Sequence, residues 1–242
     1  MDARDSAFRN RLREMVSGGV LMDEPMALHT SMRAGGRADI VVFPVGRAEL
    51  AGLITFLKAC GVSYTALGNG TNLIVRDGGY RGVVICLQKL KGISLPGSGE
   101  ERTMAALAGT PLREMVSRAA QEGLSGLEFC AGIPGSLGGA LRMNAGAYGR
   151  EMKDVVIRLE LLNSEGEVKS IEREDLVFSY RNLELPAGAL IVDGEFALRA
   201  SSREAVEKEV RRILDLRGAK HPLNFPNSGS IFKNPAGAPA GR

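Results

Sequence analysis

The stretch that decides the fold reads GIPGSLGGALRMNAGAYG and occupies residues 132–149. Glycine at this density carries an entropic cost on the order of 1 kcal/mol per residue relative to alanine. Connections of this length in compact domains are usually functional. We interpret the stretch as backbone packed against a large, flat ligand, and a purely structural bend is the alternative.

A second glycine cluster, GNGTN at residues 68–72, lies between two apolar runs, so we expect a loop that joins two strands. Its successive N–H groups can form an anion-binding nest for phosphate, with Thr71 and Asn72 as side-chain donors. A tight structural turn is the alternative interpretation. Neither cluster has the G-x-G-x-x-G or G-x-x-x-x-G-K-[ST] spacing, which disfavours a Rossmann dehydrogenase and a P-loop kinase.

Hydrophobic periodicity predicts the elements around these clusters. Helices are expected over residues 6–17 and 49–60, after Thr110-Pro111 as cap and first turn, and behind a capping box at 201–204. Strands are expected over residues 39–44, 63–67, 73–75, 83–87, 103–108, 155–161, 167–171 and 190–198. This mixture with short connections predicts a layered α/β or α+β fold, with a domain change near residue 200.

The composition limits the classes of partner. A net charge of +3, spread along 242 residues, is too weak to indicate nucleic acid. Three cysteines without a CxxC pair and only two histidines disfavour a metal site, and reduced cysteines favour the cytoplasm. No apolar run is long enough to span a bilayer, and the N-terminal residues lack the apolar core of a signal peptide.

Polar residues form a third group, at Tyr180-Arg181 and in the run NSGSIFKNP at residues 227–235. The planar arginine fork suits a carboxylate partner. Ser230 is either a proton donor or a cap, and Lys233 and Asn234 are candidates for binding phosphate. Solvated surface side chains are the alternative for each of them.

The order of these motifs resembles one family, the UDP-N-acetylenolpyruvoylglucosamine reductases. The matching stretches are HT and GGRAD within 29–39, LGNGTNLIV at 67–75, GLSGLEF at 123–129, GIPG at 132–135, MNAGAYG at 143–149, YR at 180–181 and GSIFKNP at 229–235. The resemblance covers nearly the whole chain from about residue 26. It implies an α+β fold, with a two-subdomain FAD-binding module of the vanillyl-alcohol-oxidase (PCMH) type followed by the start of an α+β substrate-binding domain.

Domain limits follow from the resemblance. Residues 1–25 would form an N-terminal helical segment, and residues 26–200 the FAD-binding domain, with subdomains of about 26–92 and 93–200. Residues 201–242 would begin a substrate-binding domain that is incomplete here. Family members continue beyond this point and carry a glutamate near the C-terminus that assists protonation, so we expect a truncated chain that binds FAD with little turnover.

The resemblance also implies the cofactors and the site. FAD would bind non-covalently, and NADPH would reduce it before the UDP-sugar substrate replaces NADP in the same cleft. The residues expected to bind FAD are Gly68, Asn69, Gly70, Thr71, Asn72, Gly132, Ile133, Pro134, Gly135, Ser136, Gly138, Gly139, Asn144, Ala145, Gly146 and Tyr148.

The implied reaction reduces an enolpyruvyl UDP-sugar to UDP-N-acetylmuramate for peptidoglycan synthesis. Reduced flavin would deliver hydride to the β-carbon, while Arg181 stabilises the charge that develops on the substrate carboxylate. Ser230 would then donate a proton to the α-carbon. Lys220, Lys233 and Asn234 would bind the UDP phosphates.

Two other functions fit the same residues. One is a different flavin oxidoreductase of the same fold that acts on another alcohol or sugar, and the other is a non-catalytic nucleotide-binding module. The sequence contains no signal for the oligomeric state.

Overall fold

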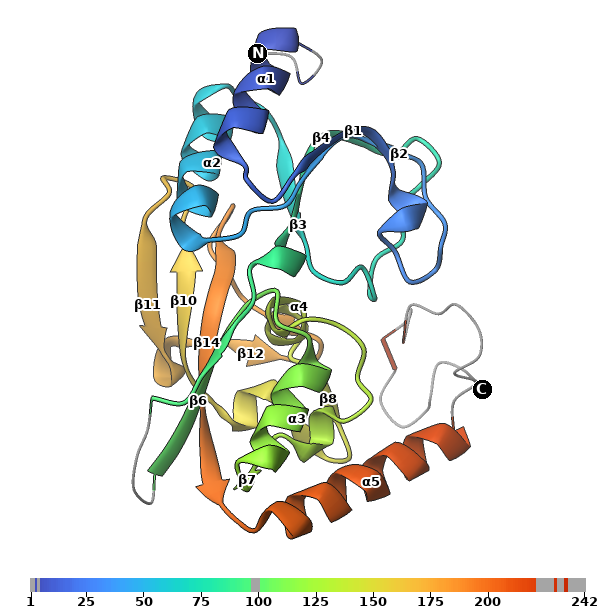
Figure 1. Cartoon of the computed structure of the whole chain (residues 1–242), viewed down its shortest axis with the longest axis vertical. Coiled ribbons are helices and arrows are strands. Elements are labelled where there is room, and N and C mark those ends of the chain that lie inside the picture. Colours follow the sequence, from blue (N-terminus) through green and yellow to red (C-terminus); the bar gives the residue numbers. More distant parts are fainter. Residues whose placement is uncertain (1–2, 4, 97–100, 221–228, 230–232, 235–242) are drawn as a thin grey trace.

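The computed structural model describes residues 3, 5–96, 101–220, 229, 233 and 234 of the chain (Figure 1). Its α-helices are α1 (Ser6–Met15), α2 (Arg47–Ala59), α3 (Leu112–Gln121), α4 (Leu137–Arg142) and α5 (Arg203–Lys220). The short 3-10 helices are η1 (Met26–Leu28), η2 (Leu87–Lys89), η3 (Glu128–Cys130), η4 (Met152–Asp154) and η5 (Arg173–Asp175). The strands are β1 (Val20–Pro25), β2 (Arg37–Val42), β3 (Tyr64–Leu67), β4 (Tyr80–Cys86), β5 (Ile93–Ser94), β6 (Glu101–Leu107), β7 (Leu124–Ser125), β8 (Gly146–Ala147), β9 (Arg150–Glu151), β10 (Val156–Leu162), β11 (Val168–Glu172), β12 (Phe178–Ser179), β13 (Asn182–Leu183) and β14 (Leu190–Ala200).

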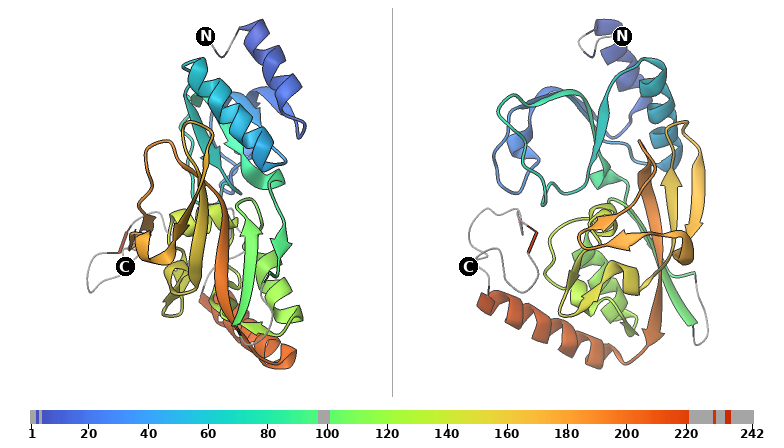
Figure 2. Two further views of the ribbon diagram at one scale, coloured as in Figure 1. Left: turned by 90° about the vertical axis from the view of Figure 1, so that its left-hand side faces the viewer. Right: turned by 180° about the vertical axis from the view of Figure 1, so that it is seen from behind.

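The first lobe runs from α1 to β4 and is built on a four-stranded sheet of order β1-β2-β4-β3. Strands β2, β4 and β3 are parallel, and β1 pairs antiparallel with β2. Helices α1 and α2 cover one face, where Phe8 and Phe56 stack with ring centroids 5.4 Å apart (Figure 2). Strand β2 is buried from Ala38 to Val42, and its sequence there is apolar apart from the buried Asp39.

Helix α2 illustrates how the sequence specifies this packing. Leu50, Leu53, Ile54 and Leu57 are fully buried and share one face of the helix. The helix ends where Gly61 adopts a φ of +65°, a left-handed conformation that glycine reaches without strain. The expected helix over residues 49–60 is therefore confirmed to within two residues at its start and one at its end.

The second lobe runs from β5 to α5 and contains an antiparallel sheet of order β11-β10-β14-β6-β5, with β7 paired to β14. The central strand β14 has Phe196 fully buried, and α4 packs on it where Gly194 lies against Leu141. Helix α3 buries Leu112, Met115 and Val116. One apolar cluster continues from α1 and α2 into this sheet, so the two lobes share a core.

Helix α5 crosses the end of the second lobe that lies farthest from the N-terminus (Figures 1 and 2). Val206 and Ile213 form its buried face. The hydroxyl of Ser202 accepts a hydrogen bond from the Ala205 N–H at 3.1 Å, so Ser202 caps the helix. The expected capping box started at Ser201, and the structure corrects it by one residue.

Three other expectations about elements were wrong. Residues 73–75 form no strand: Ile74 is 58% exposed and continues the loop between β3 and β4. The Thr110 hydroxyl does not cap α3, because it exchanges hydrogen bonds with the backbone of Gly92 instead. Residues 20–25 are not part of a helical segment, since they form β1 and pair with β2.

Candidate active site

The two glycine clusters lie against each other at the junction of the lobes. The first loop (residues 68–72) connects β3 to β4, and the second loop (residues 132–149) contains α4 (Figure 1). The Thr71 hydroxyl donates to the Pro134 carbonyl at 3.2 Å. A Cβ on Gly135 would lie 3.1 Å from Thr71 Oγ1, and a Cβ on Gly68 would overlap Ser136 Oγ. A side chain of each loop, Thr71 or Ser136, therefore packs against a glycine of the other loop.

Glycine is required at position 70 of the first loop for two reasons. Gly70 has a φ of +63°, and a Cβ there would overlap the carbonyl oxygen of His29. The Ser31 N–H donates to the Gly70 carbonyl at 3.0 Å, so residues 29–31 support the loop from behind. Asn69 is half-buried beside Gly70, and the neighbouring side chains of Leu73 and Ile74 are exposed.

Ser136 has a buried hydroxyl between the two loops. The residue is 1% exposed, and Oγ has no hydrogen-bond partner among the described residues. Ser136 precedes α4, but its side chain makes no capping hydrogen bond. A buried hydroxyl without a partner costs about 1–3 kcal/mol, so a polar ligand atom at this position would recover that cost. The unpaired hydroxyl and the bare glycine at position 68 fit a polar, flat group held between the loops.

Some backbone N–H groups of the second loop already donate hydrogen bonds within the protein. The Ile133 N–H donates to the Cys130 carbonyl at 3.0 Å, and the Gly138 N–H donates to the Ala108 carbonyl at 2.8 Å. Gly138 also lies close to Ala108, since a Cβ added to this glycine would stand 3.0 Å from the alanine Cβ. These amides hold the loop in place, so the contacts that Ile133 and Gly138 can offer a ligand come from their other atoms.

Asn144 likewise organises the loop from inside. It is 3% exposed with a φ of +41°. Its Nδ2 donates to Glu151 at 2.9 Å and to the Ser179 carbonyl at 3.2 Å, and its Oδ1 accepts from the Lys153 N–H at 3.1 Å. Every polar atom of this side chain is therefore engaged within the protein. The role that sequence reasoning gave Asn144, direct binding of FAD, stays a prediction.

The last part of the second loop reaches α5. Ala145 donates its N–H to Ala140 at 2.8 Å, and Gly146 pairs with Glu151 between β8 and β9. Tyr148 is 40% exposed, and its hydroxyl donates to the Ile213 carbonyl at 3.4 Å. The exposed tyrosine thus connects the second loop to α5.

Helix α5 also contacts the start of the second loop, which sequence reasoning did not foresee. A Cβ on Gly132 would lie 2.6 Å from Cδ of Arg217 and 3.2 Å from Leu214. The Nε of Arg217 is buried and has no hydrogen-bond partner in the described part of the chain. Helical periodicity places Arg217 on α5, but no local signal in the sequence indicates that it packs on a glycine some eighty positions earlier.

Arg181 lies close to the first loop. It occupies the turn between β12 and β13 with a φ of +57°. Its Nη2 donates to Asn72 Oδ1 at 3.1 Å, which joins the second lobe to the first loop. The Tyr180 hydroxyl accepts from the Asn234 N–H at 3.4 Å. The structure thus brings Arg181, Asn72 and Asn234 to the same region.

The structure describes only some of the other residues that are predicted to bind the substrate. Lys233 is exposed, and Lys220 is the last residue of α5. The side chain of Lys220 and the whole of Ser230 lie outside the described residues. Their expected roles stay predictions.

The cysteines near the site are not nucleophiles. Burial raises the pKa of the Cys86 thiol to about 11, and Cys86 lies beneath the first loop with Sγ 3.9 Å from the Gly68 carbonyl. Burial likewise raises the pKa of Cys130 to about 12. Both thiols are protonated at neutral pH. The described residues contain no cluster of three or more His, Cys, Asp and Glu suited to a metal ion.

Comparison with known proteins defines the class of protein first. A family model described as an FAD binding domain matches residues 38–172, which include the whole first loop and the second loop. A VAO-type flavoprotein from Myceliophthora thermophila shares the fold, with a TM-score of 0.61 at 13% identity over 81% of this chain and 47% of that chain. The chain is thus an α+β flavoprotein with a VAO-type FAD-binding module.

The particular family follows from closer relatives. A UDP-N-acetylenolpyruvoylglucosamine reductase from Syntrophus aciditrophicus is 51% identical over 98% of this chain and 77% of its own length. The crystal structure of the reductase MurB from Thermus caldophilus superposes with a TM-score of 0.77 at 31% identity, covering 92% of this chain and 77% of that chain. The chain belongs to the UDP-N-acetylenolpyruvoylglucosamine reductase family.

Proposed function

We propose that the chain binds FAD between the first and second loops and uses it, with NADPH as co-substrate, to reduce the enolpyruvyl UDP-sugar to UDP-N-acetylmuramate. This is a step in the synthesis of peptidoglycan precursors. Membership of the reductase family and the FAD-binding domain over residues 38–172 support the reaction. The partner is a small-molecule UDP-sugar.

One observation carries the proposal: glycine loops from two lobes meet around a buried, unpaired serine hydroxyl. The dinucleotide would lie along the first loop, where N–H groups and the Thr71 and Asn72 side chains can contact its phosphates. Ser136 and the backbone of Gly135 and Gly139 would contact it from the second loop. Because the glycines add no side chains, a planar ring system can approach the backbone closely.

The bound cofactor supplies hydride transfer, and the protein residues bind and polarise the substrate. The Arg181 guanidinium would hold the substrate carboxylate and stabilise charge that develops beside it. Its hydrogen bond to Asn72 keeps it at the edge of the first loop. Ser230 would donate the proton to the α-carbon. Lys220, Lys233 and Asn234 would contact the UDP phosphates.

We also propose a cytoplasmic location. Cys86 and Cys130 are buried and take part in no disulfide. Thiols that stay unpaired are typical of proteins in a reducing compartment. Among the described helices, none combines the length and apolar character that a bilayer crossing requires.

The experiment separates the two half-reactions. The purified chain is reconstituted with FAD, reduced anaerobically with NADPH, and then mixed with the enolpyruvyl UDP-sugar while the flavin absorption is followed. We expect FAD to be retained and bleached by NADPH, and the rate at which the sugar restores the absorption measures the turnover that this chain supports. Failure to retain FAD would contradict the proposal. Bleaching of the oxidised flavin by an alcohol or another sugar, in place of NADPH, would support a different flavin oxidoreductase.

A further inference from the structure

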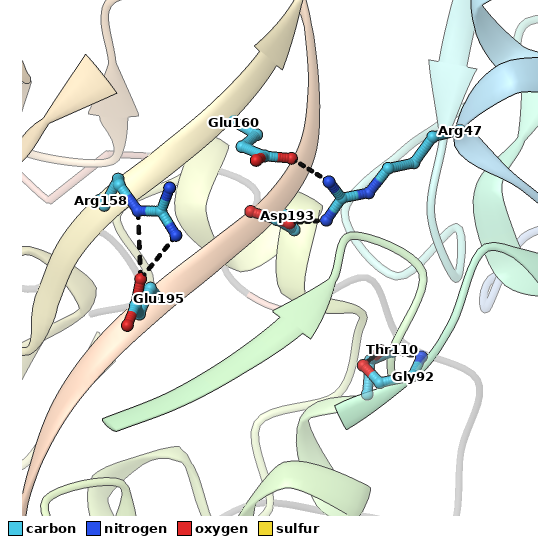
Figure 3. Close-up of polar contacts among 7 residues, drawn as sticks. All are labelled: Arg47, Gly92, Thr110, Arg158, Glu160, Asp193 and Glu195. Carbon is cyan, nitrogen blue, oxygen red and sulfur yellow. Dashed lines mark hydrogen bonds and ion pairs between the residues drawn. The ribbon is translucent and has the colours of Figure 1, made fainter. Parts of the chain in front are cut away.

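Helix α2 of the first lobe is fixed at both ends to the second lobe. At its first residue, Arg47 pairs through Nη1 with Glu160 on β10 and through Nη2 with Asp193 on β14 (Figure 3). Near its end, Lys58 pairs with Glu165 in the turn between β10 and β11. The helix therefore lies along the β10–β11 hairpin, with an ion pair at each end.

The Arg47 contact is specific to arginine. Glu160 and Asp193 are opposite each other in the register of β10 and β14, and their side chains are only 19% and 13% exposed. Two neighbouring carboxylates repel each other, and a planar guanidinium can donate one N–H to each of them. Burial raises the pKa of Asp193 to about 6, while the charge of Arg47 opposes this rise and Glu160 adds to it.

Backbone contacts lead from Asp193 to the second loop. The neighbouring Val192 carbonyl accepts from the Ala108 N–H at 2.8 Å, and the Ala108 carbonyl accepts from the Gly138 N–H at 2.8 Å. On the other side of Asp193, a Cβ on Gly194 would lie 3.0 Å from Leu141 of α4. The strand that Arg47 holds is thus the strand on which the second loop rests.

The first loop is connected to Arg47 through α2 itself. The helix is followed after four residues by β3, and β3 ends at Leu67, directly before the first loop. The chain crosses between the lobes close by, where Gly92 and the fully buried Thr110 exchange hydrogen bonds of 3.1 Å (Figure 3). Arg47 and this crossing hold the lobes together while the two loops meet through the Thr71–Pro134 contact.

We propose that Arg47 is a positioning residue for FAD: by joining α2 to β10 and β14, it sets the separation of the first and second loops. The inference rests on the proposed function, because it takes FAD as the ligand held by those loops. Arg47 lies outside both loops, at the start of α2, and would act through them. Its loss would leave both loops intact but would widen or loosen the space between them.

The test compares Arg47→Met with a matched control, Arg158→Met. Arg158 pairs with Glu195 through hydrogen bonds of 3.1 and 2.8 Å, and both residues belong to the second lobe. The two arginines are 43% and 39% exposed and both pair with carboxylates of the same sheet, but only Arg47 connects that sheet to the first lobe. The measured quantities are the rate of FAD release, by recovery of flavin fluorescence, and the midpoint of thermal unfolding of the FAD-free chain.

We expect Arg47→Met to release FAD roughly fivefold faster than wild type, because a partly exposed ion pair contributes up to about 1 kcal/mol. Arg158→Met should release FAD at the wild-type rate while losing a similar amount of thermal stability. Arg47→Lys keeps the charge but not the fork, so its release rate should lie between those of wild type and Arg47→Met. This milder variant decides the matter if Arg47→Met does not fold.

Three results would overturn the inference. Release of FAD from Arg47→Met, or from Arg47→Lys where that variant alone folds, at the wild-type rate would remove the positioning role and leave the proposed function intact. Equal acceleration in Arg47→Met and Arg158→Met would show a general loss of stability. A wild-type chain that binds no FAD would contradict the proposed function and this inference together.

Discussion

At the scale of single residues, Ser136 combines two opposite energetic effects. Its hydroxyl is buried at 1% exposure without a hydrogen-bond partner in the described chain, so it destabilises the protein that lacks a ligand. The same hydroxyl lies against Gly68 of the first loop, within the site proposed for FAD. Stability and cofactor binding should therefore respond in opposite directions when this oxygen is removed.

Ser136→Ala should weaken FAD binding by roughly fivefold to tenfold, since a lost hydrogen bond is worth about 1 kcal/mol. The FAD-free variant should be at least as stable as wild type, because alanine leaves no unpaired hydroxyl. Fluorescence titration with FAD and urea unfolding measure the two quantities. Ser117→Ala, at an exposed serine on α3, is the control and should change neither. Unchanged FAD affinity in Ser136→Ala would argue against contact between Ser136 and the cofactor.

Asp193 gives a prediction about pH. Burial raises its pKa from an ordinary 3.8 to about 6, so the folded chain holds a proton that the unfolded chain releases between these values. The stability from this group is fully present below about pH 3.8 and is lost as the pH rises through about 6. Asp193→Asn does not titrate. Its free energy of unfolding relative to wild type should therefore increase by about 1 kcal/mol across this window, after allowance for solvent screening.

Urea unfolding at a series of pH values measures this difference. Asp175→Asn, at an exposed aspartate of the same lobe, is the control and should show no such trend. A difference between Asp193→Asn and wild type that stays constant, or falls as the pH rises, would contradict the assignment.

At the scale of elements, patterns within the sequence were sufficient where burial is one-sided. The apolar stripe of α2 and the alternation along β10 predicted those elements almost to their ends. Residues 73–75 were predicted to form a strand because Leu73 and Ile74 are apolar, yet both side chains are exposed beside the first loop. Helix α4 was missed because its sequence contains two glycines and resembles a loop. A short apolar run that is exposed in a loop thus breaks the usual relation between hydrophobicity and strand formation.

The packing of helix α5 gives a test at the scale of elements. Ile213 is 2% exposed against the second lobe, and its carbonyl accepts from Tyr148 of the second loop. Ile213→Ala should reduce the free energy of unfolding by about 2–4 kcal/mol, as expected for a truncated buried isoleucine. Leu214→Ala, at a 44% exposed neighbour, should cost less than about 1 kcal/mol. Denaturant unfolding of both variants checks the packing, and equal losses would contradict it.

At the scale of the whole molecule, the sequence motifs indicated the ligand but not the geometry around it. Two glycine clusters separated by some sixty residues were interpreted as ligand loops, with structural turns as the alternative, and FAD as their ligand was implied by the family resemblance and stays a prediction. Their meeting depends on contacts with no local signature, such as the Arg47 ion pairs and the Thr71–Pro134 hydrogen bond. Contacts between distant side chains leave no periodicity in a single sequence, so they had to come from the structure.

Hydrogen exchange of the chain with and without FAD tests the central claim most directly. If the cofactor lies between the lobes, FAD should slow exchange in both the first loop and the second loop, in proportion to occupancy, while β11 at the far edge of the second sheet is unaffected. Protection confined to one loop, or located away from both, would contradict a site formed by the two lobes together.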